Sequence, residues 1–419
     1  MKKSMFLAAV AAMVLAGCTK DESIVEQQEI GFQPLAYKAS QTKGDTAGDE
    51  TGSTTTNQQT TDNVITDAFY PTNGPSFGLF AYQLDGVSQG TFDANNAKAK
   101  LYIDNKPVKY TSNYWRTDPK SFWPLQGSLT FIAYSPFGVS ASHRINEITT
   151  NEQVTKLSSV LTINGFQAGT KGQKDLMWSN LSKDNIANST NYDADGNNTD
   201  TYGGVPILFN HALCRIKITA KTAENYSGFA TYKLKQIQVV GLKDNATLTV
   251  TDNVAQWTAP TANLGTAITV DDATKYAFNF FAPASETEYI ELNSMNSELV
   301  NYDNEEKDAQ GAYREIGLLA IPQSLNGVQL LVTYTMTVDP NDQVADDEVV
   351  TETTKVVTLF KDDVLETLDQ NKVYTLNLSI SADEILYSPD VNEWESQYDS
   401  DDDDDLDKDY GADYTIPGA

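Results

Sequence analysis

The stretch Val205-Pro-Ile-Leu-Phe-Asn-His-Ala-Leu-Cys-Arg-Ile-Lys-Ile-Thr-Ala220 lies near the middle of the chain, after a polar loop. From Cys214 onward its side chains alternate strictly between apolar and polar. A period of two is typical of a β-strand with one face buried and the other in water. We therefore predict the first core strand of a second β-domain, with an apolar face of Cys214, Ile216, Ile218 and Ala220 and a wet face of Arg215, Lys217 and Thr219.

Other segments show the same period. Alternating apolar residues run from Val328 to Val338 and from Tyr374 to Ile380. In Tyr232–Val240 the apolar parity switches, which predicts a β-bulge near Gln236. No long segment has a helical period, so we predict an all-β fold. In the first half, strands separated by Gly, Pro and Asn turns are expected at 77–83, 100–103, 108–114, 129–134, 160–163 and 175–178.

Length and composition indicate the number of domains. At roughly 150 residues per domain, a chain of 419 residues accommodates two domains and additional segments. Hydrophobic residues make up 40% of the chain, with 21 Tyr and 16 Phe, and they supply adequate cores. We predict a signal peptide over 1–18, a tether with a first strand and a Thr-rich linker over 19–63, β-domains over 64–204 and 205–394, and an acidic tail over 395–419.

The net charge of −29 excludes one class of partner. An acidic surface repels phosphates, so we expect no nucleic-acid binding. With only two Cys and two His, a His/Cys metal cluster cannot be assembled, and we expect no cofactor. If Cys18 carries lipid, it cannot form a disulfide with Cys214, and packing must supply the stability.

The N-terminus has the features of a lipoprotein signal peptide. Lys2 and Lys3 precede an apolar segment that is too short to span a bilayer. Leu15-Ala-Gly-Cys18 resembles a lipobox, which makes Cys18 the predicted lipidation site; an ordinary secretory signal is the alternative. The following Thr19-Lys-Asp-Glu-Ser23 resembles a short acidic signal for export to the cell surface. We therefore expect a surface-exposed outer-membrane protein held by lipid through Cys18.

A short extended segment, Ile30 to Tyr37, precedes a polar linker. Ile30 and Phe32 alternate with small or polar residues, and Pro34, which has no backbone N–H, favours an edge strand. The linker over 39–63 contains no large apolar residue and cannot offset the entropy of ordering, so we expect it to be mobile. Within the linker, Asp45-Thr-Ala47 resembles an O-glycosylation motif and makes Thr46 a candidate site.

Two motifs match only part of a chemical site. Gly74-Pro-Ser-Phe-Gly78 fits G-x-S-x-G, but a strand pattern follows the serine where a nucleophile elbow needs a helix, so we predict no enzyme activity. Asn191, Asp193 and Asp195 occupy positions 1, 3 and 5 of a calcium loop. Its twelfth position is Tyr202 instead of the bidentate Glu, which favours a simple turn and leaves calcium binding as the alternative.

Six segments together carry a family pattern. The longest are Phe209-Asn-His-Ala-Leu-Cys-Arg-Ile216 and Phe122-Trp-Pro-Leu-Gln-Gly-Ser-Leu-Thr-Phe-Ile-Ala-Tyr-Ser-Pro136, and the others are Phe77–Tyr82, Asp175–Trp178, Ala320–Gln323 and Lys372–Leu376. In their order along the chain they resemble the fimbrillin family, the pilin-like surface lipoproteins of the Bacteroidota. The resemblance implies two transthyretin-like β-sandwich domains and a structural or adhesive subunit of a fimbria. It brings no catalytic residues.

The resemblance also implies a route of assembly. In the family, a surface protease removes the first strand and a strand of the next subunit replaces it, so the expected partners are other fimbrial subunits or copies of this chain. The family's usual arginine is missing, because the first arginine here is Arg116. Lys38 and Lys43 are the only basic residues between the first strand and the folded body, and they are the candidate cleavage sites. The alternative is a stand-alone surface lipoprotein that binds a glycan or a protein and does not polymerise.

Replacing Cys18 by Ala is expected to abolish membrane attachment. Each methylene of an acyl chain buried in the bilayer contributes about 0.8 kcal/mol, and the variant has no such chain. The measurement is the partition of the protein between outer-membrane vesicles and the soluble fraction, with Thr19→Ala as the control. If the Cys18→Ala variant stays with the vesicles, lipid is not the anchor.

Overall fold

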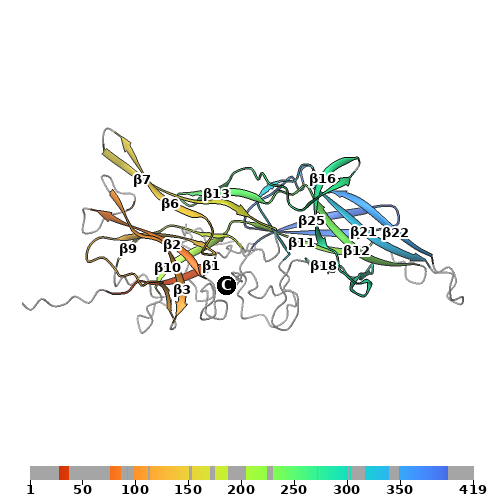
Figure 1. The fold of residues 1–419 in the computed structure, drawn as a ribbon, viewed down its shortest axis with the longest axis horizontal. Coiled ribbons are helices and arrows are strands. Elements are labelled where there is room, and N and C mark those ends of the chain that lie inside the picture. The colour runs from red at the N-terminus through yellow and green to blue at the C-terminus, as the bar shows by residue number, and fades with distance from the viewer. Residues whose placement is uncertain are drawn as a thin grey trace, which may run out of the picture.

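The computed structural model describes residues 28–36, 76–85, 92, 98–111, 114–150, 153–169, 175–186, 204–223, 230–270, 272–300, 302, 317–338 and 349–394. The molecule is elongated, and its strands gather towards the two ends of the long axis (Figure 1). Strands dominate the described residues, which confirms the all-β prediction. None of the helices described is long and apolar enough to cross a membrane.

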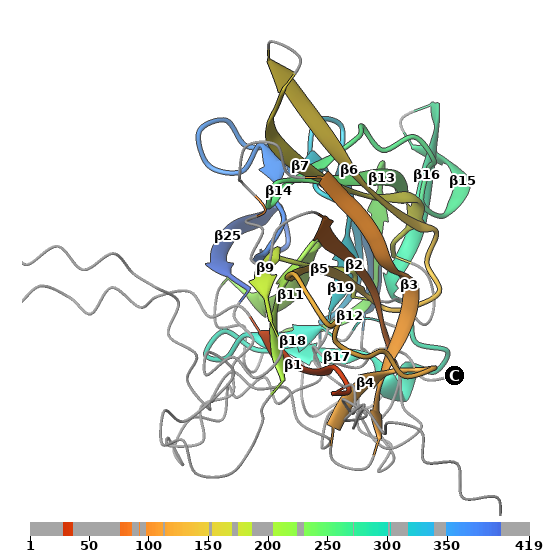
Figure 2. The same cartoon turned by 90° about the vertical axis from the view of Figure 1, so that its left-hand side faces the viewer.

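An eight-stranded sheet forms one end of the molecule. Its order is β2-β3-β4-β1-β10-β8-β5-β9, and β2 also pairs with β5, so the sheet closes on itself as a barrel. Strand β1 lies between β4 and β10 in this circuit, and Figure 2, which faces this end, shows β1 beside β4. The strands are β1 (Gly31–Ala36), β2 (Phe77–Asp85), β3 (Lys98–Thr111), β4 (Tyr114–Thr117), β5 (Leu129–Ser135), β8 (Met177–Ser179), β9 (Ser182–Asn185) and β10 (Val205–His211).

Alternation along β2 shows that both faces of this sheet are apolar. Phe77, Leu79 and Ala81 join the cluster that fills the barrel. Phe80 and Tyr82 join a second cluster on the outer face. That outer cluster packs against a four-stranded sheet of order β14-β13-β7-β6, made of β6 (Ala141–Thr150), β7 (Gln153–Gln167), β13 (Asn245–Thr251) and β14 (Val254–Trp257).

Two further sheets face each other as a sandwich at the other end. Both contribute to one large buried cluster, in which Ile216, Leu234, Tyr334 and Leu376 are almost completely covered. The first sheet holds β11 (Cys214–Thr222), β18 (Glu298–Val300), β19 (Leu318–Ala320), β24 (Lys372–Ile380) and β25 (Ile385–Glu393). The second holds β12 (Ala230–Val240), β15 (Thr266–Val270), β16 (Ala273–Phe281), β17 (Ile290–Leu292), β21 (Gln329–Val338) and β22 (Val349–Thr358). The remaining elements are the pair β20 (Gln323–Ser324) and β23 (Thr367–Leu368) and the 3-10 turn η3 (Glu286–Glu288).

The central stretch 205–220 forms two strands in two different sheets. Strand β10 belongs to the barrel, where it pairs with β1 and β8, and β11 begins the five-stranded sheet. Between them Ala212 and Leu213 are fully buried, so the chain turns from one sheet to the other inside the core. The stretch is therefore not a single strand, and only its part from Cys214 onward forms the predicted core strand. Pairing also crosses the expected boundary at 204/205, because β13 pairs with β7; the division into two domains stays a prediction.

The predicted apolar face of β11 is confirmed, but its polar face is only partly wet. Arg215 is 2% exposed, and its guanidinium carbon lies 5.2 Å from the ring centre of Trp394. Trp394 in turn stacks on His211, with ring centres 4.0 Å apart, and His211 Nδ1 lies 2.7 Å from Asp175 Oδ2. A tryptophan from the end of β25 thus covers the point where the chain passes from the barrel to the sandwich, and it keeps Arg215 from water.

We expect Trp394→Ala to destabilise the protein by about 3–5 kcal/mol, because it leaves a cavity at a site that is 1% exposed. Denaturant unfolding measures the change in the free energy of unfolding. Leu386→Ala on the same strand is the control, since Leu386 is 57% exposed and its loss leaves no cavity. Equal effects of the two changes would contradict this role for Trp394.

Candidate functional site

The site that the fold presents is the place occupied by β1 in the barrel. On one side, Phe32–Ala36 pairs in parallel with Val205–Phe209 of β10. On the other side, Gly31 and Phe32 pair with Arg116 and Trp115 of β4. Strand β1 therefore completes the hydrogen bonding of two neighbours that are otherwise separated.

Residues before β1 extend this pairing. The Ile30 N–H donates to the Ser121 carbonyl at 2.9 Å, and the Trp123 N–H donates to the Gln28 carbonyl at 2.9 Å. Glu29 forms an isolated antiparallel bridge with Phe122. The segment 28–36 is thus held by β4 and the following loop along its first part, and by β10 along its second part.

Two large side chains anchor the segment in the barrel. Ile30 and Phe32 are at most 2% exposed and belong to the cluster that fills the barrel. The Phe32 ring meets Phe131 edge-on at 5.5 Å, and Trp123 meets Phe131 in the same way at 6.1 Å. Burial of one such side chain contributes about 1.5–3 kcal/mol. An occupant of this place therefore needs large apolar residues two positions apart.

A glycine allows the backbone of β1 to come close. Gly204 has φ +90°, and a Cβ built on it would lie 2.6 Å from Phe32 N and 2.7 Å from the Gly31 carbonyl carbon. Only glycine fits such a position without movement of β1. Gly204 immediately precedes β10, so it sits where the two strands begin to pair.

Two residues of β1, Gln33 and Pro34, leave hydrogen bonds unformed. The Gln33 side chain is 6% exposed, and its Oε1 has no hydrogen-bond partner among the described residues. Pro34 donates no backbone hydrogen bond, and it lies beyond the described pairing with β4, which ends at Phe32. The expectation of an edge strand was therefore wrong for β1 as a whole, which lies between β4 and β10; only its second part, which holds Pro34, lacks a described partner on the β4 side. A buried acceptor without a partner lowers the stability of the strand in its place.

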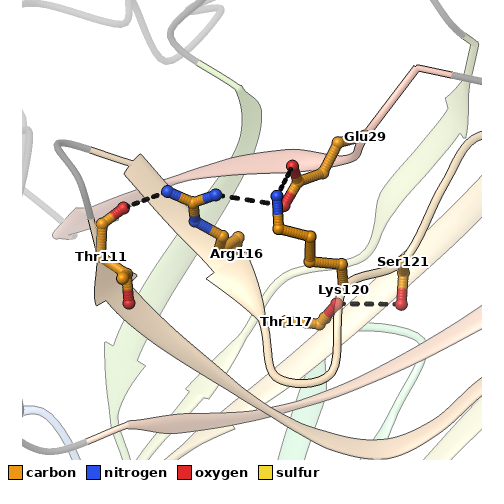
Figure 3. Close-up of polar contacts among 6 residues, drawn as sticks. All are labelled: Glu29, Thr111, Arg116, Thr117, Lys120 and Ser121. Carbon is orange, nitrogen blue, oxygen red and sulfur yellow. Dashed lines mark hydrogen bonds and ion pairs between the residues drawn. The ribbon is translucent and has the colours of Figure 1, made fainter.

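A pair of cations binds the start of the segment. Glu29 Oε2 accepts a hydrogen bond from Lys120 Nζ at 2.7 Å, and Glu29 Oε1 lies 3.5 Å from Arg116 Nη1. Arg116 Nη2 donates to the Thr111 carbonyl at 2.6 Å, which orients the guanidinium towards Glu29 (Figure 3). Thr117 Oγ1 donates to Ser121 Oγ at 2.9 Å and fastens the turn that carries Lys120.

The structure does not describe the site residues that were expected from sequence. The lipidation site Cys18, the cleavage candidates Lys38 and Lys43, the glycosylation candidate Thr46 and the calcium candidates Asn191, Asp193 and Asp195 all fall outside the described residues. Those assignments stay predictions. Within the described ranges, no group of three or more His, Cys, Asp or Glu is placed to hold a metal ion.

The two histidines are engaged in the interior. His143 Nε2 lies 2.7 Å from Ser159 Oγ, and the ring packs against Phe80 and Tyr82. Burial lowers the pKa of His143 to about 3, so it stays neutral at physiological pH. Ser159 is completely buried, whereas His143 is partly exposed. Ser76 of the G-x-S-x-G match is followed directly by strand β2, as its sequence context indicated.

Glu29, Arg116, Lys120 and Gly204 were not singled out from sequence. A single charge before a short strand is too common a pattern to indicate an ion pair with distant residues. The Gly203-Gly204 pair before an alternating strand was the available signal, because glycine at the start of a strand often marks a close approach of backbones.

A family model described as fimbrillin-like matches residues 72–394. A fimbrial protein from Bacteroides vulgatus ATCC 8482 is similar in structure, with 16% identity and a TM-score of 0.48, over 88% of this chain and 99% of that chain. The tip fimbrial protein Mfa3 from Porphyromonas gingivalis, with a C-terminal truncation, is similar with 10% identity and a TM-score of 0.28, over 77% and 95%. No curated protein matches the chain.

Gly204→Ala is expected to loosen β1. The new Cβ meets Phe32 N, so the change should cost a further ~1–3 kcal/mol beyond the strain of a positive φ. Hydrogen exchange of 28–36, followed by mass spectrometry, should become faster. Gly138→Ala is a matched control, since Gly138 has φ +98° and its added Cβ would meet nothing within 4 Å. Unchanged exchange in the Gly204→Ala variant would contradict the close approach.

Proposed function

The chain belongs to the fimbrillin-like family, and we propose from this that it assembles into a cell-surface fimbria by exchange of its first strand. Membership of the family makes it a fimbrial or adhesive subunit. The proposed role is structural and non-enzymatic. Its partners are other fimbrial subunits or further copies of this chain.

One observation carries the proposal: β1 is a complete and separable part of the barrel wall. It pairs with β10 over Phe32–Ala36 and with β4 only at Gly31 and Phe32. It enters the barrel from the N-terminal side of the chain, and the remaining barrel strands lie after residue 76. Removal of this segment therefore opens the wall between β4 and β10 and removes no other strand that the structure describes.

The opened wall would favour a replacement strand. Two edges with unpaired backbone groups bind an added strand through main-chain hydrogen bonds, while the pockets for alternate side chains select its sequence. Here those pockets are the ones that Ile30 and Phe32 occupy. The imperfect fit of Gln33 and Pro34 leaves room for another strand to bind more tightly than β1 does.

The remaining parts of the proposal follow from the sequence. Cleavage after Lys38 or Lys43 separates β1 from the body, because Lys38 directly follows the strand segment and Lys43 lies in the polar linker after it. Lipid on Cys18 holds the uncleaved chain in the outer membrane, with the body at the cell surface. A chain that is never cleaved keeps β1 and stays a lipid-tethered, capped subunit.

Limited digestion with trypsin tests the exchange. We expect a new N-terminus at Ala39 or Gly44, followed by oligomers whose size increases with protein concentration. N-terminal sequencing and light scattering measure the two outcomes. The control is the double variant Lys38→Gln/Lys43→Gln, which should keep β1 covalently attached and remain monomeric. If the wild-type chain is cleaved cleanly and still stays monomeric, exchange does not occur and the stand-alone alternative gains support.

A further inference from the structure

Arg116 and Lys120 meet one carboxylate at the mouth of the β1 site. Both contact Glu29, which is 28% exposed, and Arg116 is 18% exposed. The other nearby cations have different partners, since Lys109 pairs with Asp118 at 3.0 Å and Lys106 donates to Ser121 Oγ at 3.1 Å. Glu29 is therefore the carboxylate that Arg116 and Lys120 share in the described part of the chain.

We propose that Arg116 and Lys120 form a carboxylate clamp that selects the incoming strand and sets its register. The partner is an extended segment of another subunit with an acidic residue immediately before its first buried apolar residue. This inference rests on the proposed strand exchange. According to this inference, the incoming strand must carry an acidic residue as well as apolar residues that fit the pockets.

Hydrogen bonds from outside β1 support both cations. The Thr111 carbonyl holds Arg116 from one side, and the turn that carries Lys120 is fastened by the Thr117–Ser121 and Lys106–Ser121 hydrogen bonds. The side chain of Arg116 and the turn that carries Lys120 are thus held by groups of the barrel body in addition to their contacts with the segment 28–36. They keep their positions relative to the pockets when the occupant changes.

Register follows from the alternation of side chains. Glu29 faces the clamp, and Ile30 and Phe32, one and three residues later, enter the barrel. A slip of one residue would turn the carboxylate towards the apolar interior and would take the apolar residues out of it. An acidic residue in the clamp therefore fixes which residues enter the pockets.

Cleavage and release of the first segment take the carboxylate of Glu29 away from Arg116 and Lys120. Cuts after Lys38 or Lys43 remove the whole segment that contains Glu29, and the two cations lose the partner that they share. An incoming strand with an acidic residue at this position restores both ion pairs, while a basic residue there is repelled. The charge of the residue before the first apolar side chain therefore determines, together with the apolar side chains, which strand this site binds.

A charge exchange in the full-length chain tests the clamp. Glu29→Lys should raise hydrogen exchange of 28–36 by about ten-fold, and adding Arg116→Glu with Lys120→Glu should restore most of the protection. The control variant Lys109→Glu, which changes a neighbouring cation paired with Asp118, should leave the exchange of 28–36 unchanged. Failure of the triple variant to regain protection would overturn the clamp.

Peptide capture tests the selection of a partner strand. Fluorescent peptides with the sequence of 28–36, with Glu or Lys at position 29, are added to the full chain after the trypsin cut. Wild-type protein should bind the Glu peptide about ten-fold more tightly than the Lys peptide, and the Arg116→Glu/Lys120→Glu protein should show the reverse preference. If that double variant does not fold, Arg116→Gln/Lys120→Gln replaces it and should bind both peptides equally.

The outcomes separate the two ideas. Equal capture of both peptides by wild-type protein would overturn the selection and leave strand exchange intact. Capture of neither peptide, together with a successful charge exchange in the full chain, would overturn strand exchange and with it the selection of a partner strand. Preferential capture of the Glu peptide supports both.

Discussion

Closure of the barrel depends on one short segment that pairs with two neighbours. Strand β1 supplies the hydrogen bonds that β10 and β4 cannot supply to each other, and its Ile30 and Phe32 fill part of the interior. Backbone groups at an open sheet edge need partners, and a barrel satisfies them by leaving no edge in its wall. The first strand therefore closes the hydrogen-bonded wall of the barrel and also fills part of its apolar interior. The proposed assembly makes use of that double role, because any replacement must satisfy both demands.

The other end of the molecule is built on a different constraint. Its two sheets share one continuous core, and the passage from barrel to sandwich is buried under Trp394. The contacts of this tryptophan with His211 and Arg215 join the end of β25 to a stretch about 180 residues earlier in the chain. Polar groups are retained in this interior with their partners: His211 lies beside Asp175, and Arg215 lies against an aromatic ring. The connection between the two ends is thus packed as tightly as the sheets that it joins.

Local patterns in the sequence predicted the features that depend on neighbouring residues. The buried face of β11 and the bulge near Gln236 are both observed. Features that depend on distant pairing were missed. Arg215 is buried by a residue at the end of β25, and two strands expected at 100–103 and 108–114 are one strand with Asn105 at a positive φ. For the site, the position of the first strand was predicted, but its ion pairs were not. Only closure of the barrel brings Glu29 to Arg116 and Lys120.

The direct passage from β10 to β11 has a mechanical consequence. The chain crosses from the barrel to the sandwich through Ala212 and Leu213, and each flanking strand is hydrogen-bonded inside its own sheet. Tension applied between the two ends of the molecule would pass through this short connection to both ladders. The pairing of β13 with β7 provides a second link along the same axis (Figure 1). Extension would therefore require the rupture of strand ladders, since no slack linker is available at this crossing to lengthen first.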